Sequence, residues 1–192
     1  GSMSATGRGR ERNARDFYRT PRWCVEALLK HEPIAPPYFD PCCGDGAILK
    51  VLAEHGPSAG LDIHEPSTAL CLSRGLEVGC GDYLAHDYCE NLRGSTVMNP
   101  PYRKAAEFIR QAIGERSRGG KVAALLRLNF LGSSRKRIDL VGPGSCLRSV
   151  LVLSRRPSFT GDGRTDACEY AWFVWEVGYD GSASLRVLDA TP

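Results

Sequence analysis

Long hydrophobic runs are missing from this 192-residue chain: no stretch approaches the roughly 20 apolar residues of a membrane-spanning helix. No signal peptide opens it either, so we expect a cytoplasmic protein without a membrane partner. Gly1 and Ser2 precede Met3 as a cloning remnant does. We expect residues 1–16 to form a tag remnant and mobile basic arm, and residues 17–192 a single domain with a full hydrophobic core.

Metal-binding and phosphate-loop motifs are also missing. Eight cysteines occur, but none forms a CxxC pair, and the adjacent Cys42 and Cys43 suit neither a zinc knuckle nor a ready disulfide. We therefore expect reduced, mostly buried thiols and no metal. Neither GxGxxG nor GxxxxGK followed by Ser or Thr occurs, which argues against a P-loop nucleotide site.

A large excess of one charge is also missing: the net charge is only +3. The basic residues are nevertheless clustered. Residues 8–30 are rich in Arg, and further groups are Arg135-Lys136-Arg137 and Arg155-Arg156. A polyanionic partner would explain these patches. A solvated basic surface explains each patch equally well when it is taken alone, so charge by itself leaves the partner open.

Short apolar strands alternate with single helices, a pattern typical of a parallel sheet covered on both faces, and the predicted fold class is α/β. Thr20 and Pro21 indicate the N-cap and first residue of a helix that runs to about His31. Further helices are predicted over 47–54, 67–74 and 105–113, and strands over 38–40, 59–63, 76–80, 95–98, 122–128, 149–153 and 170–177. The aromatic-rich last strand is expected to pair antiparallel with 149–153.

A glycine-rich corner follows the first predicted strand, in the segment FDPCCGDGAI. Gly44 and Gly46 let backbone amides approach a ligand, and ligands of open α/β sheets lie beyond the carboxyl ends of the strands. Asp62 ends the second strand, where a carboxylate can bind a ribose diol, with Glu65 as the alternative. Asp82 ends the third strand and could accept a hydrogen bond from an adenine amino group. These acidic strand ends predict a ligand that contains a nucleoside.

Two successive prolines, Pro100 and Pro101, follow the fourth predicted strand in the segment NPPY. Prolines fix φ and remove backbone donors, so they stiffen a corner on the same edge of the sheet. The Asn99 side-chain oxygen and the Pro100 carbonyl would accept both N–H groups of an exocyclic amine, which localises its lone pair and aims it at an electrophile. Tyr102 offers a face on which a planar base can stack.

The sequence resembles the class I methyltransferases that use S-adenosylmethionine, and most closely the small phage-type DNA N6-adenine methyltransferases. Matching segments run in order from residue 16 to about residue 178: DFYRTP, FDPCCGDGAI, GLDIHEP, CGDYL, MNPPY, GGKVAALLRLNFL and RRPSFTGDGRTDACEYAWFVW. The resemblance implies a Rossmann-like fold, with a mostly parallel seven-stranded sheet, an antiparallel last strand and helices on both faces. It also implies a site-specific, adenine-specific DNA methyltransferase of a bacterial or phage-infected cell, with S-adenosyl-L-methionine as cofactor and a role in phage biology or restriction-modification.

Carried over residue by residue, the resemblance implies three groups of site residues. The cofactor would be bound by Tyr18, Thr20, Asp40, Cys42, Gly44, Asp62, Ile63, Asp82 and Tyr83. The target amine would be held by Asn99, Pro100, Pro101 and Tyr102, with Phe159 against the flipped base from the other side. DNA phosphates would be bound by Arg135, Lys136, Arg137, Arg155, Arg156 and Arg164. Cys42 and Cys43 stand where small or polar residues are usual, which leaves open which side chains touch the cofactor.

Other interpretations of the same motifs stay open. NPPY-type motifs also serve enzymes that methylate RNA or protein glutamine, and a methyltransferase fold without activity would act as a binding module. The DNA could be double-stranded with a flipped adenine, or single-stranded. No segment is long enough for a separate target-recognition domain, so the loops 130–147 and 154–168 would read any short site. A Pro-Cys nucleophile, as in C5-cytosine methyltransferases, is not expected at Pro41-Cys42, because this pair follows the first strand rather than the fourth.

Overall fold

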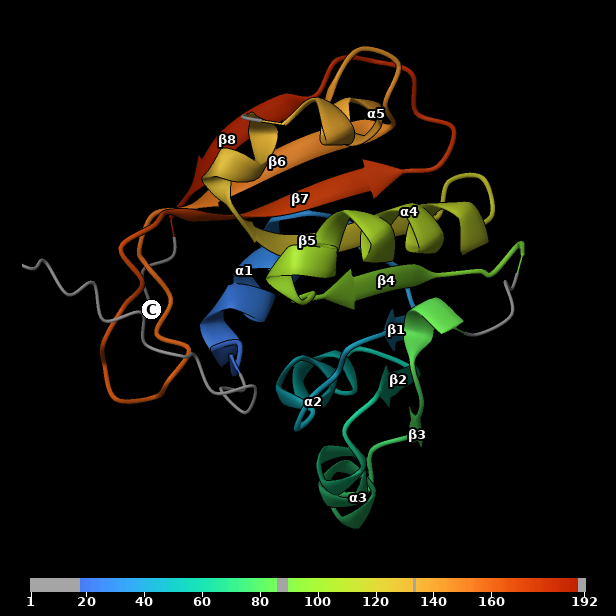
Figure 1. The fold of residues 1–192 in the computed structure, drawn as a ribbon, viewed down its shortest axis with the longest axis vertical. Coiled ribbons are helices and arrows are strands. Elements are labelled where there is room, and N and C mark those ends of the chain that lie inside the picture. The colour runs from blue at the N-terminus through green and yellow to red at the C-terminus, as the bar shows by residue number, and fades with distance from the viewer. Residues whose placement is uncertain (1–17, 86–89, 133, 190–192) are drawn as a thin grey trace, which may run out of the picture.

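The computed structural model describes residues 18–85, 90–132 and 134–189. Its centre is an eight-stranded sheet in the order β3-β2-β1-β4-β5-β7-β6-β8 (Figure 1). The strands are β1 (Tyr38–Asp40), β2 (Ser58–Asp62), β3 (Val78–Cys80), β4 (Ser95–Met98), β5 (Lys121–Arg127), β6 (Leu147–Leu153), β7 (Tyr170–Glu176) and β8 (Ser184–Leu188). Strands β1 to β5 are parallel to one another, whereas β7 is antiparallel to both β5 and β6. The predicted α/β class and the antiparallel β6–β7 pair are confirmed.

The sheet has one strand more than the predicted seven, the edge strand β8. β8 pairs parallel with β6, so the antiparallel β7 lies inside the sheet and is not the last strand of the chain. Within β8 only Leu188 is buried, while Leu185 and Val187 are exposed. The segment does alternate polar and apolar residues, but it is short and its alternating apolar side chains face solvent, so pairing with β6 rather than burial forms this strand.

The helices are α1 (Arg22–His31), α2 (Ala47–Leu52), α3 (Glu65–Ser73), α4 (Ala105–Glu115) and the short α5 (Ile138–Val141), which the sequence did not predict. The prediction that Thr20 caps α1 is wrong. Pro21 occupies the N-cap position, with an extended backbone (φ −60°, ψ 142°), and no side chain caps the helix. The Thr20 hydroxyl instead accepts a hydrogen bond from Asn99, a residue distant in sequence.

Helices cover both faces of the sheet, as Figure 1 shows, and β7 supplies side chains to both layers. Trp172 packs in the core beneath α1 and α2, and its Nε1 donates to the Cys24 carbonyl at 2.8 Å. Trp175, on the opposite face, packs with α4 and donates to the Leu140 carbonyl at 2.7 Å. Because side chains alternate along a strand, the aromatic run that sequence analysis singled out anchors both helical layers.

Among the helices of the described ranges, none is both long and apolar enough to cross a membrane. Nor do three His, Cys, Asp or Glu side chains of those ranges gather as a metal site would. The seven cysteines that the structure describes are free thiols, from the buried Cys24 to the exposed Cys80.

Candidate active site

A cavity of about 670 Å³ opens where the parallel strands β1, β2, β3 and β4 end. Carboxyl ends of parallel strands meet at one edge, so segments far apart in the sequence converge there. All the residues predicted to hold the cofactor or the target base line this cavity: Tyr18, Thr20, Asp40, Cys42, Gly44, Asp62, Ile63, Asp82, Tyr83, Asn99, Pro100, Pro101, Tyr102 and Phe159. Lys104, Phe108 and Arg127 also line it, and the sequence motifs did not point to them.

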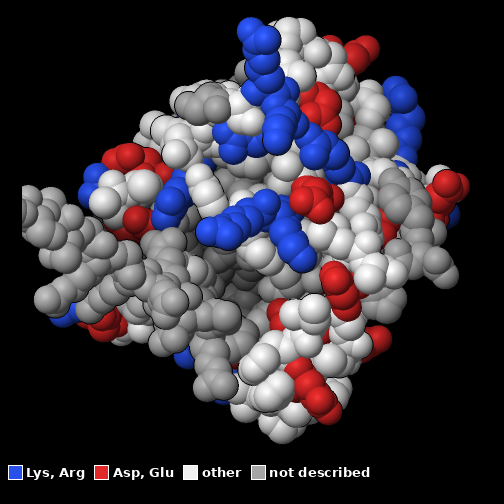
Figure 2. All heavy atoms as spheres, viewed as in Figure 1, with Lys and Arg blue, Asp and Glu red and all other residues white. Residues whose placement is uncertain are grey.

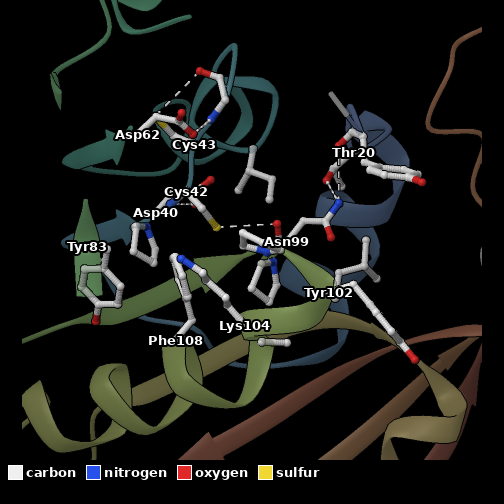
Figure 3. Close-up of a pocket in the computed structure, with 18 of the residues that line it drawn as sticks. Thr20, Asp40, Cys42, Cys43, Asp62, Tyr83, Asn99, Tyr102, Lys104 and Phe108 are labelled. Atoms are coloured by element: carbon white, nitrogen blue, oxygen red, sulfur yellow. Dashed lines mark hydrogen bonds between the residues drawn. The ribbon is translucent and has the colours of Figure 1, made fainter. Parts of the chain in front are cut away.

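The glycine corner and the end of β2 are tied together by one carboxylate. Asp62 Oδ2 accepts a hydrogen bond from the Gly44 amide at 2.8 Å, and Oδ1 accepts one from the His64 amide at 2.9 Å (Figure 3). Gly44 and Gly46 have φ values of 53° and 85°, the left-handed region that favours glycine. The corner is therefore a fixed cradle that Asp62 holds in shape, and each Asp62 oxygen, with one hydrogen bond from an amide, has a further lone pair to offer.

Asp40 lies at the floor of this cradle and is almost completely buried. Its Oδ1 accepts a hydrogen bond from the Cys42 amide at 3.1 Å. The pKa of Asp40 is raised to about 7, chiefly because the carboxyl is buried; the hydrogen bond from the Cys42 amide opposes this shift and the nearby Asp62 carboxylate adds to it. The carboxyl therefore changes charge near neutral pH, at a place where a cationic ligand would favour the charged form.

The adjacent cysteines point in different directions. The Cys42 thiol donates a 3.5 Å hydrogen bond to the Asn99 carbonyl and so joins the glycine corner to the NPPY corner (Figure 3). The Cys71 thiol donates to the Gly44 carbonyl at 3.4 Å and lies beneath the cradle with Cys43. Burial raises the pKa of both Cys42 and Cys43 well above the ordinary range of a thiol, so neither is a ready thiolate.

Another wall of the cavity is formed by the buried Tyr83. Its hydroxyl donates to the Glu115 carboxylate at 2.5 Å, and Gln111 donates to its backbone carbonyl at 2.7 Å. The Tyr83 ring, rather than its hydroxyl, therefore faces the cavity, next to Phe108 at a centroid separation of 5.2 Å. Asp82 accepts a hydrogen bond from the Leu84 amide at 3.1 Å. A ring beside a carboxylate is the kind of surface on which a planar amine-bearing base fits.

The Asn99 side chain has a fixed orientation. Its Nδ2 donates to Thr20 Oγ1 at 3.1 Å and to the Tyr18 carbonyl at 3.4 Å. A carbonyl only accepts hydrogen bonds, so the atom that faces it must be the amide nitrogen. Oδ1 therefore points the other way, as Figure 3 shows, and none of the described residues donates to it. The segment before α1 and the end of β4 together present an unused acceptor.

The two predicted base-stacking rings differ greatly in exposure. Tyr102 is 62% exposed at the cavity mouth, and the Arg127 guanidinium lies 5.0 Å from its centroid. Phe159 is only 4% exposed and lies edge-on between Tyr18 and Tyr170, at centroid separations of 5.7 and 4.9 Å. Phe159 lines the wall, whereas Tyr102 offers an open face.

The structure does not bring the predicted phosphate-binding residues into the cavity; Arg135, Lys136 and Arg137 form a 3₁₀ turn before α5. The other three Arg residues already have partners: Arg155 lies over the Trp23 ring, Arg156 pairs with Glu169 and Arg164 with Asp162. Figure 2 shows Lys and Arg side chains gathered on the face that α4 covers. The predicted basic arm, residues 1–16, lies outside the described residues.

Comparison with known proteins places the fold. No protein-family profile and no curated protein matches the sequence. Solved structures do match: a Listeria monocytogenes protein assigned to the class I S-adenosylmethionine-dependent methyltransferases has a TM-score of 0.64 and 15% identity, over 92% of this chain and 68% of that one. The M protein of the type I restriction enzyme EcoKI has a TM-score of 0.64 and 18% identity, over 91% and 49%. A proposed RNA methyltransferase from Pyrococcus horikoshii has a TM-score of 0.58 and 13% identity, over 81% of each chain.

This chain thus has the Rossmann-like fold of the class I S-adenosylmethionine-dependent methyltransferases. It spans about half the length of the EcoKI protein that it matches.

Proposed function

We propose that this protein is an S-adenosylmethionine-dependent DNA methyltransferase that acts on the exocyclic N6 amine of a flipped adenine. The observation that supports it most directly is the fixed Asn99 amide, whose Nδ2 is held by Thr20 and Tyr18, so that Oδ1 points away from them and stays available as an acceptor (Figure 3). An acceptor aimed in advance at an N–H group is what activation of an aromatic amine requires. The exposed Tyr102 ring beside it suits a base taken out of its stack.

The chemistry follows from hydrogen bonding and position. An N6 amine is a poor nucleophile because its lone pair is delocalised into the ring. Hydrogen bonds from its two N–H groups to Asn99 Oδ1 and to the Pro100 carbonyl would localise that lone pair. When bound, the cofactor supplies an electrophilic sulfonium methyl group. The amine nitrogen held by Asn99 and Pro100 would form a bond to the methyl carbon as the carbon–sulfur bond breaks, and the amine would lose one proton to solvent.

The residues of the cradle fit S-adenosylmethionine. A volume of about 670 Å³ is within the usual range of cofactor sites. Asp62 would accept the ribose hydroxyls on the lone pairs that the Gly44 and His64 amides leave unused. The Tyr83 ring and Asp82 would contact the adenine. The cationic cofactor is also favoured by the carboxylates of Asp40 and Asp62 at the same edge.

Nucleic acid is the proposed partner because basic side chains flank the cavity on one face (Figure 2). Arg135 and Lys136 are exposed in the turn before α5, and Lys104 reaches the cavity itself (Figure 3). The EcoKI protein of the same fold belongs to a restriction enzyme, which favours DNA as the polymer. The Pyrococcus protein gives RNA as the principal alternative.

The test is a methyl-transfer assay on DNA, RNA and protein in parallel, with labelled S-adenosylmethionine and mass analysis of the digested nucleosides. We expect N6-methyl-2′-deoxyadenosine from the DNA and none from the Asn99→Ala variant, whose cofactor affinity should stay near that of the wild type. Label confined to RNA or to protein glutamine would identify another substrate class. Tight cofactor binding without transfer to any polymer would indicate a binding module.

A further inference from the structure

The guanidinium of Arg127, at the end of β5, has partners on three sides. It lies over the Tyr102 ring, its NH2 group pairs with Asp166 Oδ2 at 2.8 Å, and its Nε donates to the Tyr170 hydroxyl at 3.4 Å. The Tyr170 hydroxyl in turn donates to the same Asp166 oxygen at 2.8 Å. Arg127 and Asp166 are about one-fifth exposed, so this ion pair is less screened than a surface pair.

These contacts join the two aromatic groups of the cavity. Tyr102 follows β4 and lies on one side of Arg127, while Tyr170 begins β7 and packs against Phe159 on the other side. The β5–β7 register fixes the separation between Arg127 and Tyr170, since the two residues are directly paired in the sheet. The orientation of the open Tyr102 ring is thereby coupled to rigid backbone and to the loop that carries Asp166.

Only Arg has the shape for this position. A planar guanidinium can lie over an aromatic ring while its edge donates to a carboxylate and a hydroxyl. A Lys ammonium keeps the charge but cannot do all three. Without Arg127, the Tyr102 side chain, which is 62% exposed, would sample several rotamers. Holding it in one rotamer before the base arrives reduces the conformational entropy that is lost when the base stacks on it.

We propose that Arg127 is a positioning residue that holds the Tyr102 ring ready for the target base, with Asp166 and Tyr170 holding Arg127 in turn. This inference rests on the proposed function, because it gives Tyr102 a base to receive. The role is indirect: Arg127 acts through Tyr102 and not through a phosphate. It therefore predicts that the effect of removing Arg127 depends on the presence of the Tyr102 ring.

The experiment is a double-mutant cycle on DNA methylation with Arg127→Lys, Tyr102→Ala and the double variant. Because a base that stacks on a less ordered ring binds less tightly, we expect Arg127→Lys to raise the KM for DNA roughly tenfold. Cofactor affinity and the salt dependence of DNA binding should stay unchanged, because the charge is kept. In the Tyr102→Ala background the same substitution should have no further effect. Asp166→Asn should reproduce the KM increase in part.

The chain offers a matched control. Arg148 lies 4.9 Å from the Tyr179 ring centroid and pairs with Glu176 at 3.1 Å, the same combination of contacts outside the cavity. Arg148→Lys should leave the KM unchanged. Equal KM values for Arg127→Lys and wild type, or an equal penalty with and without Tyr102, would overturn the inference alone. A wild-type protein that methylates no adenine would overturn the proposed function as well.

Discussion

Asn99 and Thr20, 79 positions apart in the sequence, are joined by a 3.1 Å hydrogen bond from the amide nitrogen to the threonine hydroxyl. This bond fixes which atom of Asn99 faces the cavity, since a rotated amide would present donors where the target amine needs an acceptor. Thr20 is buried, so no water readily replaces its hydroxyl.

Thr20→Val should therefore lower kcat about tenfold, the equivalent of one hydrogen bond of about 1.4 kcal/mol in the transition state. Thr20→Ser keeps the acceptor and should retain most of the rate. Steady-state methylation kinetics and cofactor titration distinguish the two variants. A loss of cofactor affinity with unchanged kcat would instead assign Thr20 to the methionine end of the cofactor, as the resemblance implies.

Asp62 should act on the cofactor rather than on the amine. Asp62→Ala removes the acceptor of the Gly44 and His64 amides together with the expected ribose contact. We expect the Kd for S-adenosylmethionine, measured by calorimetry, to rise by about 10- to 100-fold, as loss of a charged hydrogen bond predicts. The kcat at saturating cofactor should change little. An unchanged Kd would show that the ribose lies elsewhere, with Glu65 as the next candidate.

The raised pKa of Asp40 gives a prediction for stability. Folding raises the pKa of this carboxyl from 3.8 to about 7, so the fold favours the neutral form. That contribution is complete below about pH 4 and is lost as the pH rises toward 7. At about 1.4 kcal/mol for each pH unit in this window, the wild type should lose up to about 3 kcal/mol between pH 5 and pH 8 relative to Asp40→Asn. Chemical denaturation of both proteins across that range provides the measurement. Parallel stability curves would contradict it.

The sequence predicts the sheet edge of this site well, because glycine, proline and strand-end carboxylates are local signals. Each of four site residues lies at or shortly after the end of a predicted strand: Gly44, Asp62, Asp82 and Asn99. Because parallel strands end at the same edge of the sheet, this topology is enough to bring the four residues to one cavity. The internal placement of β7 was not predicted, since strand order depends on pairing across the sheet rather than on local pattern.

Contacts between distant segments were out of reach for the same reason. Thr20 looks like a helix cap in sequence, and only the approach of β4 makes its hydroxyl an acceptor for Asn99. Arg127 ends an apolar strand and carries no motif, yet strand pairing with Tyr170 places it against Tyr102. The Arg and Lys clusters were found by composition, but composition does not say that Arg156 pairs with Glu169.

The contacts that Arg side chains make within the protein lead to a prediction about DNA binding, since a guanidinium already engaged by a protein group contributes less binding free energy to a phosphate. Arg135 and Lys136 are exposed in the turn before α5, whereas Arg137 lies 4.6 Å from the Phe130 ring centroid and donates to the Gly132 carbonyl. Each lost phosphate contact lowers the slope of log K against log salt by about 0.9 for duplex DNA.

Arg135→Gln and Lys136→Gln should each lower that slope by about one, and Arg137→Gln by less. Fluorescence anisotropy of labelled duplex between about 50 and 200 mM salt measures it. Lys50→Gln, an exposed lysine on α2, serves as the control and should leave the slope unchanged. If all four variants retain the wild-type slope, the turn before α5 does not contact the DNA backbone, because neutralising a bound phosphate partner must change the number of ions released.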